Sequence, residues 1–280
     1  MQADAKDCTK ATHRVPATQL QLQKGARVSM VSQEQYQGYI QQAEEKILLF
    51  LRTFEDIQEN MHFGRIPEAQ ARLRDTIGDF FESAPSTLTI LEPPEDLKEF
   101  HSAFSAALAH LNNSSTGFLE GVPGPNFGGA FVNSRFSLCR GLNVLYNQRA
   151  HLPTLRSYWL LPEAESNRDA LEPQTDGVGA PVGMIHHPQT PEHADYSLYV
   201  PEYYTPDKTW PLIICLHGGY GRGDDYIWTW LRPAKSKGYL LLSPKSLGPT
   251  WSVLQPPLDS RSIRAMFDEV CKTYSVDRSR

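Results

Sequence analysis

The stretch that decides the fold is Pro211-Leu-Ile-Ile-Cys-Leu216, followed at once by His217-Gly-Gly-Tyr-Gly-Arg-Gly-Asp-Asp225. Its first part is a continuous apolar run, which is typical of a β-strand buried on both faces. Its second part is a row of turn residues, whose glycines let the backbone approach a ligand and direct its amides outward. A buried strand that ends in such a turn indicates an α/β fold with a ligand site at the turn.

The sequence on either side of this stretch alternates between strand and helix patterns. Two short β-rich runs precede it, over 180–186 and 196–200, and a second buried strand follows at Tyr239-Leu-Leu-Leu242. Apolar residues at helical spacing lie between the two buried strands and again after Asp259. This alternation predicts a parallel sheet with crossover helices over residues 179–280.

Further upstream, the apolar period is that of amphipathic helices. The predicted helices span residues 32–64, 67–81, 93–111 and 133–150. Ser32-Gln-Glu-Gln35 fits a capping box at the start of the first helix, and Gly121–Gly129 predicts a loop before the last. The long stripe on the first helix could serve a coiled-coil partner, but three further amphipathic helices favour an antiparallel bundle.

The chain therefore divides into four parts by pattern. We expect a flexible arm over residues 1–30, a helical domain over 31–151, a linker over 152–178 and an α/β region over 179–280. The linker is expected because its sequence is rich in Pro, Glu, Ser, Asn and Asp. The predicted fold class is α/β, with an N-terminal α-helical bundle followed by a partial parallel sheet.

Composition excludes several classes of function. The net charge of −5 leaves no electrostatic footprint for nucleic acid. No apolar run approaches the roughly 18 residues of a membrane span, and the N-terminal residues lack the apolar core of a signal peptide. The four cysteines are far apart, which favours free thiols over a disulfide framework or a metal site. We expect a cytoplasmic protein without metal or cofactor, and the sequence carries no signal for an oligomeric state.

Three kinds of site could use the glycine-rich turn. A dinucleotide fingerprint counted from Gly219 places Asp224 where the third glycine belongs, and the next strand ends in Ser243-Pro-Lys245 without an acidic ribose ligand. A phosphate-binding loop requires a Lys-Ser or Lys-Thr pair, which does not follow here. An H-G-G-x-G turn after a strand matches an oxyanion-hole loop. The third interpretation fits best, and a turn without any role is the plain alternative.

Several phrases of the α/β region occur together in one order. They are Tyr199-Val-Pro-Glu202, Trp210-Pro-Leu-Ile-Ile-Cys-Leu-His-Gly-Gly219, Gly238-Tyr-Leu-Leu-Leu-Ser-Pro-Lys245, Gly248-Pro-Thr-Trp251 and Tyr274-Ser-Val-Asp277. As an ordered set over residues 180–280, they resemble the phospholipase/carboxylesterase group of α/β hydrolases, in particular its polyhydroxybutyrate-depolymerase-like and feruloyl-esterase-like branch. The helical region carries no such resemblance.

The resemblance implies a carboxylic-ester hydrolase that acts on a small-molecule ester in its full-length form. Its oxyanion-hole loop would consist of His217, Gly218, Gly219, Tyr220 and Gly221. The amides of Gly219 and Tyr220 would hold the oxyanion, while His217 would shape the loop. The resemblance makes Trp251 a candidate for lining a substrate pocket, with plain packing as the alternative.

Residues 1–280 contain no G-x-S-x-G elbow, which carries the nucleophile in such enzymes. Ser243, Ser246 and the pair Ser114-Ser115 lack the glycines of the elbow. The resemblance therefore implies that nucleophile, acid and base lie beyond Arg280, that the sheet is truncated and that strand 211–216 forms an open edge. The chain is then an esterase fragment without activity. The alternative is a non-catalytic helical interaction module with a degenerate hydrolase scaffold.

His186 and His187 are the remaining candidates for a metal site. They are adjacent on a predicted strand, so their side chains should point to opposite faces of the sheet. We therefore expect them not to bind one metal ion together.

Overall fold

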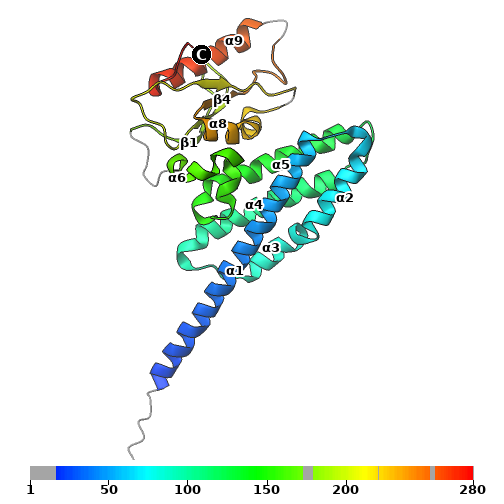
Figure 1. Ribbon diagram of the computed structural model, residues 1–280, viewed down its shortest axis with the longest axis vertical. Helices are drawn as coiled ribbons and strands as arrows, with labels where there is room; N and C mark the ends of the chain where they lie inside the picture. The colour runs from blue at the N-terminus through cyan, green and yellow to red at the C-terminus, as the bar shows by residue number, and fades with distance from the viewer. Residues whose placement is uncertain (1–16, 173–178, 220, 253–255, 280) are drawn as a thin grey trace, which may run out of the picture.

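The computed structural model describes residues 17–172, 179–219, 221–252 and 256–279. A helical part and an α/β part follow each other along the chain and pack together (Figure 1). No helix within these ranges is long and apolar enough to cross a membrane.

The helical part consists of α-helices joined by short turns. They are α1 (Ala17–Glu59), α2 (Ile66–Ile77), α3 (Phe80–Ile90), α4 (Lys98–Leu119) and α5 (Phe127–Asn147), with the 3-10 turns η1 (Phe63–Arg65), η2 (Glu95–Leu97) and η3 (Arg149–His151). The antiparallel packing of α4 and α5 is visible in paired contacts, since Ser134 donates to the Ser114 carbonyl and Phe127 packs on Phe118. The predicted bundle is therefore present.

The apolar stripe of α1 forms the core of this bundle. Its members Tyr36, Ile40, Ala43, Ile47, Phe50, Phe54 and Ile57 are all buried. Aromatic edges fix the packing, with ring centroids 4.9 Å apart for Phe50 and Phe81 and 5.2 Å apart for Phe54 and Phe118. Along these residues the stripe packs within the chain and does not face a coiled-coil partner.

Three helix boundaries differ from the sequence predictions. Helix α1 already begins at Ala17, so residues 17–30 are helical and not an arm. The second predicted helix is two helices, because Gly78 has φ 55°, a conformation that ends a helix. Helix α5 begins at Phe127, inside the predicted loop, since the Phe127 ring packs against Phe118. Residues 1–16 lie outside the described ranges.

The segment expected as a linker packs against the rest of the molecule. It forms η4 (Leu155–Trp159), η5 (Pro162–Asn167) and the short helix α6 (Arg168–Leu171). Its apolar residues Leu152, Leu155, Trp159 and Leu160 are buried. The segment was predicted as a linker because these few buried apolar residues stand among many polar ones. Residues 173–178 lie outside the described ranges.

The α/β part is built on a mixed four-stranded sheet with the order β1-β2-β4-β3. Its strands are β1 (Gly183–His187), β2 (Tyr196–Val200), β3 (Leu212–Ile214) and β4 (Leu240–Pro244), and the helices are α7 (Gly223–Tyr226), α8 (Leu231–Lys237) and α9 (Pro256–Thr273), with η6 (Ile227–Thr229) between α7 and α8. Only β3 and β4 are parallel; β2 is antiparallel to both β1 and β4.

The prediction of a parallel sheet is thus wrong for half of the strands. A parallel connection needs a crossover of a dozen or more residues. The stretch from β3 to β4 meets this requirement with α7 and α8, whereas residues 188–195 between β1 and β2 do not.

Strand β3 lies at an edge of the sheet, as expected, but is shorter than the apolar run 211–216. Ile214 and Leu216 are 39% and 48% exposed. After α9 the chain reaches this edge, where Trp210 and Val276 form an isolated parallel bridge. The Trp210 amide donates to the Ser275 carbonyl at 2.8 Å, and the Asp277 amide donates to the Trp210 carbonyl at 2.8 Å.

Candidate functional site

The glycine-rich turn leaves β3 at the carboxyl end of the parallel pair and leads into α7. Two of its glycines are required by close approach. A Cβ at Gly223 would lie 2.2 Å from the Ser243 carbonyl oxygen of β4, and one at Gly221 would lie 2.9 Å from the His217 Cβ. Both distances are shorter than a non-bonded contact allows. The backbone at Gly223 therefore packs directly on β4, and the backbone at Gly221 packs directly on His217.

The amides of Gly218 and Gly219 make no hydrogen bond with any residue that the structure describes. The Gly221 amide, in contrast, donates to the Gly218 carbonyl at 3.1 Å and closes the turn. Tyr220, expected to supply the second oxyanion donor, lies outside the described residues. The turn thus offers two adjacent free donors at the end of a parallel strand.

His217 is buried inside the loop, with both ring nitrogens engaged. The Ser246 amide donates to Nε2 at 3.1 Å, and Nδ1 lies 2.7 Å from the Gly218 carbonyl oxygen. Because an amide only donates, Nε2 accepts, and Nδ1 carries the proton that it donates to the carbonyl. His217 therefore holds the loop and has no free nitrogen with which to serve as a catalytic base.

Trp251 lies directly beside His217. Its indole Nε1 donates to the His217 carbonyl at 2.7 Å, and the two rings are 4.7 Å apart. Asp259 fixes the surrounding segment by accepting from the amides of Leu247 and Ser252, at 2.9 and 2.5 Å. Trp251 is thus a support of the loop, and its role in lining a substrate pocket stays a prediction.

The serines considered from sequence are all engaged and buried. Ser243 Oγ donates to the Cys215 carbonyl at 3.2 Å, and Ser246 Oγ donates to the Gly248 carbonyl at 2.6 Å. Ser114 lies in the α4–α5 contact, with its Oγ 3.3 Å from that of Ser134. None of these hydroxyls is paired with a histidine.

One serine–histidine pair was missed from sequence, because it arises from strand register. Ser197 on β2 lies opposite His186 on β1, and its Oγ is 2.8 Å from His186 Nδ1. The other ring nitrogen is 3.4 Å from Asn143 Oδ1. Ser197 is buried, and a distant neutral amide is a poor partner for an imidazolium. We interpret the pair as a cross-strand structural contact.

His186 and His187 point to opposite faces of the sheet, as predicted. His186 reaches Asn143 on α5, whereas His187 stacks on Tyr196 at 4.4 Å and lies 3.6 Å from Glu269 on α9. Within the described ranges, no group of three or more His, Cys, Asp or Glu residues could hold a metal ion. Cys139, Cys215 and Cys271 are free thiols, and Cys8 lies outside those ranges.

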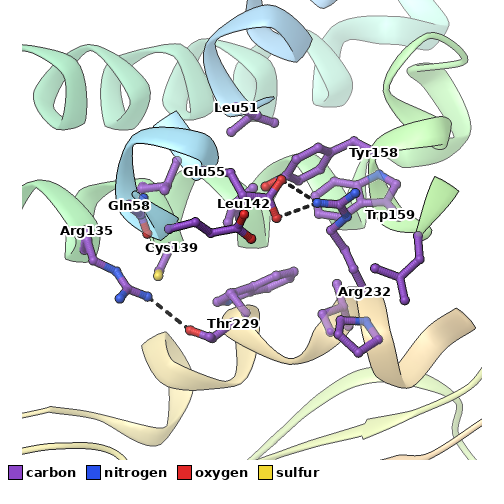
Figure 2. A pocket seen from close by; sticks show the side chains of 16 residues that line it. Leu51, Glu55, Gln58, Arg135, Cys139, Leu142, Tyr158, Trp159, Thr229 and Arg232 are labelled. Carbon is purple, nitrogen blue, oxygen red and sulfur yellow. Dashed lines mark hydrogen bonds and ion pairs between the residues drawn. The ribbon is translucent and has the colours of Figure 1, made fainter. Parts of the chain in front are cut away.

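A cavity of about 330 Å³ lies where the helical and α/β parts meet (Figure 2). Arg232 on α8 donates to both carboxylate oxygens of Glu55 on α1 at 2.5 Å, and Arg135 donates to Thr229 at 3.1 Å. Burial raises the pKa of Cys139 in its wall to about 12, so this sulfur stays a protonated thiol. The cavity is a joint between the two parts without an activated nucleophile.

A buried charge cluster completes the joint. Lys235 on α8 is fully buried, and its Nζ lies 2.7 Å from Glu202 and 3.1 Å from Glu172. Arg149 lies 3.2 Å from Glu202, and the Tyr199 hydroxyl donates to Glu202 at 3.0 Å. Every charge in this cluster faces an opposite one, which is the condition under which buried ions are tolerated.

Comparison of the chain with family models, with curated proteins and with solved structures found no match.

Proposed function

We propose that the α/β part is the oxyanion-hole portion of a carboxylic-ester hydrolase of the serine-esterase type. The observation that carries this proposal is the pair of free amides at Gly218 and Gly219, held at the end of β3 by His217. Fixed N–H donors stabilise the negative charge that develops on a carbonyl oxygen during acyl transfer. The tight seat at Gly221 and Gly223 keeps these donors in place without reorganisation.

Residues 1–280 contain no G-x-S-x-G elbow, so under this proposal the nucleophile would come from outside them. It would stand on a strand that pairs with the open edge of β3. The parallel bridge between Trp210 and Val276 supports this placement, since it brings the backbone after α9 to that edge. An oxyanion hole without nucleophile and base does not start acyl transfer, so residues 1–280 alone should be inactive.

The second candidate is a non-catalytic interaction module whose hydrolase region serves as scaffold. The burial of Lys235 and its carboxylates favours it, because this cluster joins the helical part firmly to the sheet. The two candidates differ in the role of the Gly219 amide. In an esterase this amide stays free to bind an oxyanion, whereas a non-catalytic scaffold does not require a free amide at this position.

Nuclear magnetic resonance on the ¹⁵N-labelled chain tests the esterase proposal. Methylphosphonate, a stable tetrahedral oxyanion, should shift the amide signals of Gly218 and Gly219 and leave that of Gly238, which follows α8, unchanged. The free amides should also exchange with solvent faster than the bonded Gly221 amide. Protection of Gly219 against exchange, with no response to the anion, would remove the basis of the proposal.

A fluorophosphonate probe tests where the nucleophile is. We expect no labelling of residues 1–280, because each serine considered above is buried and bonded. Labelling at Ser197, abolished by His186→Ala, would place the nucleophile in the cross-strand pair and overturn our assignment.

A further inference from the structure

A second cavity, of about 400 Å³, lies in the helical part. It is lined by α1, by the start of α4 and by the chain that follows α5. Its lining includes Tyr36, Ile40, Glu44, Phe100, His151 and Thr154. Its size is within the range of small-molecule sites, about 300–1,000 Å³. It shares no residue with the glycine-rich turn, so this inference is independent of the proposed esterase function.

Two polar atoms in its wall have no hydrogen-bond partner among the described residues. They are the hydroxyl of Tyr36 and the Oε1 of Glu44, in side chains that are 1% and 2% exposed. Both residues lie on the same face of α1, two turns apart. Buried polar groups in native structures are nearly always bonded, so an unbonded pair in one cavity needs an explanation.

The described surroundings of Glu44 consist of hydrogen-bond donors and one like charge. Hydrogen bonds from Thr154 and from the Leu155 backbone reach its carboxyl group, and Glu45 is the charged neighbour. None of the ion pairs within the described ranges includes Glu44. These donors compensate the carboxyl group only in part, because burial still raises its pKa, and no cation among the described residues faces it.

Aromatic rings complete the wall. Tyr36 and Phe100 both line the cavity, and Phe100 lies 5.1 Å from the ring of His151. Ring faces attract cations through their quadrupole, and the attraction grows as water is excluded. An aromatic wall with one uncompensated carboxylate is the combination that recognises an ammonium group.

We propose that this cavity binds a small organic ammonium ion. The ammonium group would donate to Glu44 Oε1, and its carbon skeleton would extend along Ile40 and Phe100 toward the Tyr36 hydroxyl. A neutral ligand of the same shape would leave Glu44 uncompensated. Charge is therefore the main determinant of specificity.

Titration calorimetry on the full 280-residue chain, with benzylamine and its neutral isostere benzyl alcohol, tests the proposal. Benzylamine should bind at least tenfold more tightly than benzyl alcohol and should raise Tm. Glu44→Gln should weaken benzylamine binding at least tenfold, and Tyr36→Phe severalfold. Glu45→Gln, which changes the exposed charged neighbour on the same helix, is the matched control and should weaken binding far less than Glu44→Gln.

Circular dichroism of each variant separates loss of binding from loss of folding. If Glu44→Gln does not fold, Tyr36→Phe carries the test, since it removes one oxygen from the same wall. Equal affinity for the amine and the alcohol would overturn the proposal, as would failure of benzylamine, phenethylamine and tetramethylammonium to bind at millimolar concentration. Binding that Glu45→Gln weakens as strongly as Glu44→Gln would place the amine on the surface and also contradict it.

Discussion

Two carboxylates show how differently the two parts of this molecule treat a buried charge. Glu202, at the joint with the α/β part, is 7% exposed and Glu44, in the bundle, is 2% exposed. Burial raises the pKa of both, but at Glu202 the charges of Lys235 and Arg149 outweigh burial and lower it, whereas the pKa of Glu44 remains raised. Glu202, whose charge is balanced by Lys235 and Arg149, holds secondary-structure elements together. Glu44, which faces no cation among the described residues, is the group on which we base the proposed binding site.

The largest effect should come from breaking the compensated cluster. Lys235→Met leaves Glu202 and Glu172 without their shared cation, which should cost about 3–5 kcal/mol of unfolding free energy. Urea denaturation followed by circular dichroism measures this loss. Lys237→Met, at an exposed position on the same helix, is the control and should change stability little. Equal effects of the two substitutions would show that Lys235 is not needed as a partner.

A matched pair of tyrosines distinguishes the two environments without changing a charge. Tyr199→Phe removes a hydrogen bond to the Glu202 carboxylate and should cost roughly 1.5–3 kcal/mol. Tyr36→Phe removes a hydroxyl that has no partner among the described residues and should cost nothing or stabilise. Denaturation midpoints of the two variants measure the difference. The same loss in both would mean that the Tyr36 hydroxyl is bonded in solution.

The pH dependence of stability should have opposite signs at the two carboxylates. Glu44→Gln should stabilise the chain at pH 7, by less than the losses above, because it removes an uncompensated carboxylate. The gain should vanish below the unfolded pKa of about 4.3, where the carboxyl is protonated in both states. Glu202→Gln should destabilise at pH 7 and lose its effect as the pH falls below the lowered pKa of Glu202. Unfolding at pH 7 and pH 3 checks both signs.

The smallest effect belongs to an ion pair that is only partly buried. The side chains of Glu55 and Arg232 are 36% and 18% exposed. A double-mutant cycle with Glu55→Gln and Arg232→Met should give a coupling of about 0.2–1 kcal/mol, because water screens such pairs. A coupling energy as large as the loss of unfolding free energy in Lys235→Met would indicate that Glu55 and Arg232 are shielded from water.

Local patterns in the sequence were sufficient for several elements. The stripe from Tyr36 to Ile57 predicted the buried face of α1. The apolar run at 211–216 predicted a strand followed by a tight turn, but the expectation that this strand is buried on both faces was wrong, since β3 is a partly exposed edge. The split at Gly78 could have been predicted from glycine alone, but the phenylalanines on either side continued the helical period. The antiparallel strands were missed because hydrophobic runs do not carry strand direction.

By itself the sequence determined the order of the two parts, the helix faces that are buried and the glycine turn at Gly219, because these depend on local spacing and on backbone freedom. Only the tertiary structure decided which buried charges find partners. Glu44, Glu202 and Lys235 all look alike in sequence, as single charges near apolar residues. Their different states arise because long-range packing delivers Lys235 to Glu202, whereas no cation among the described residues reaches Glu44.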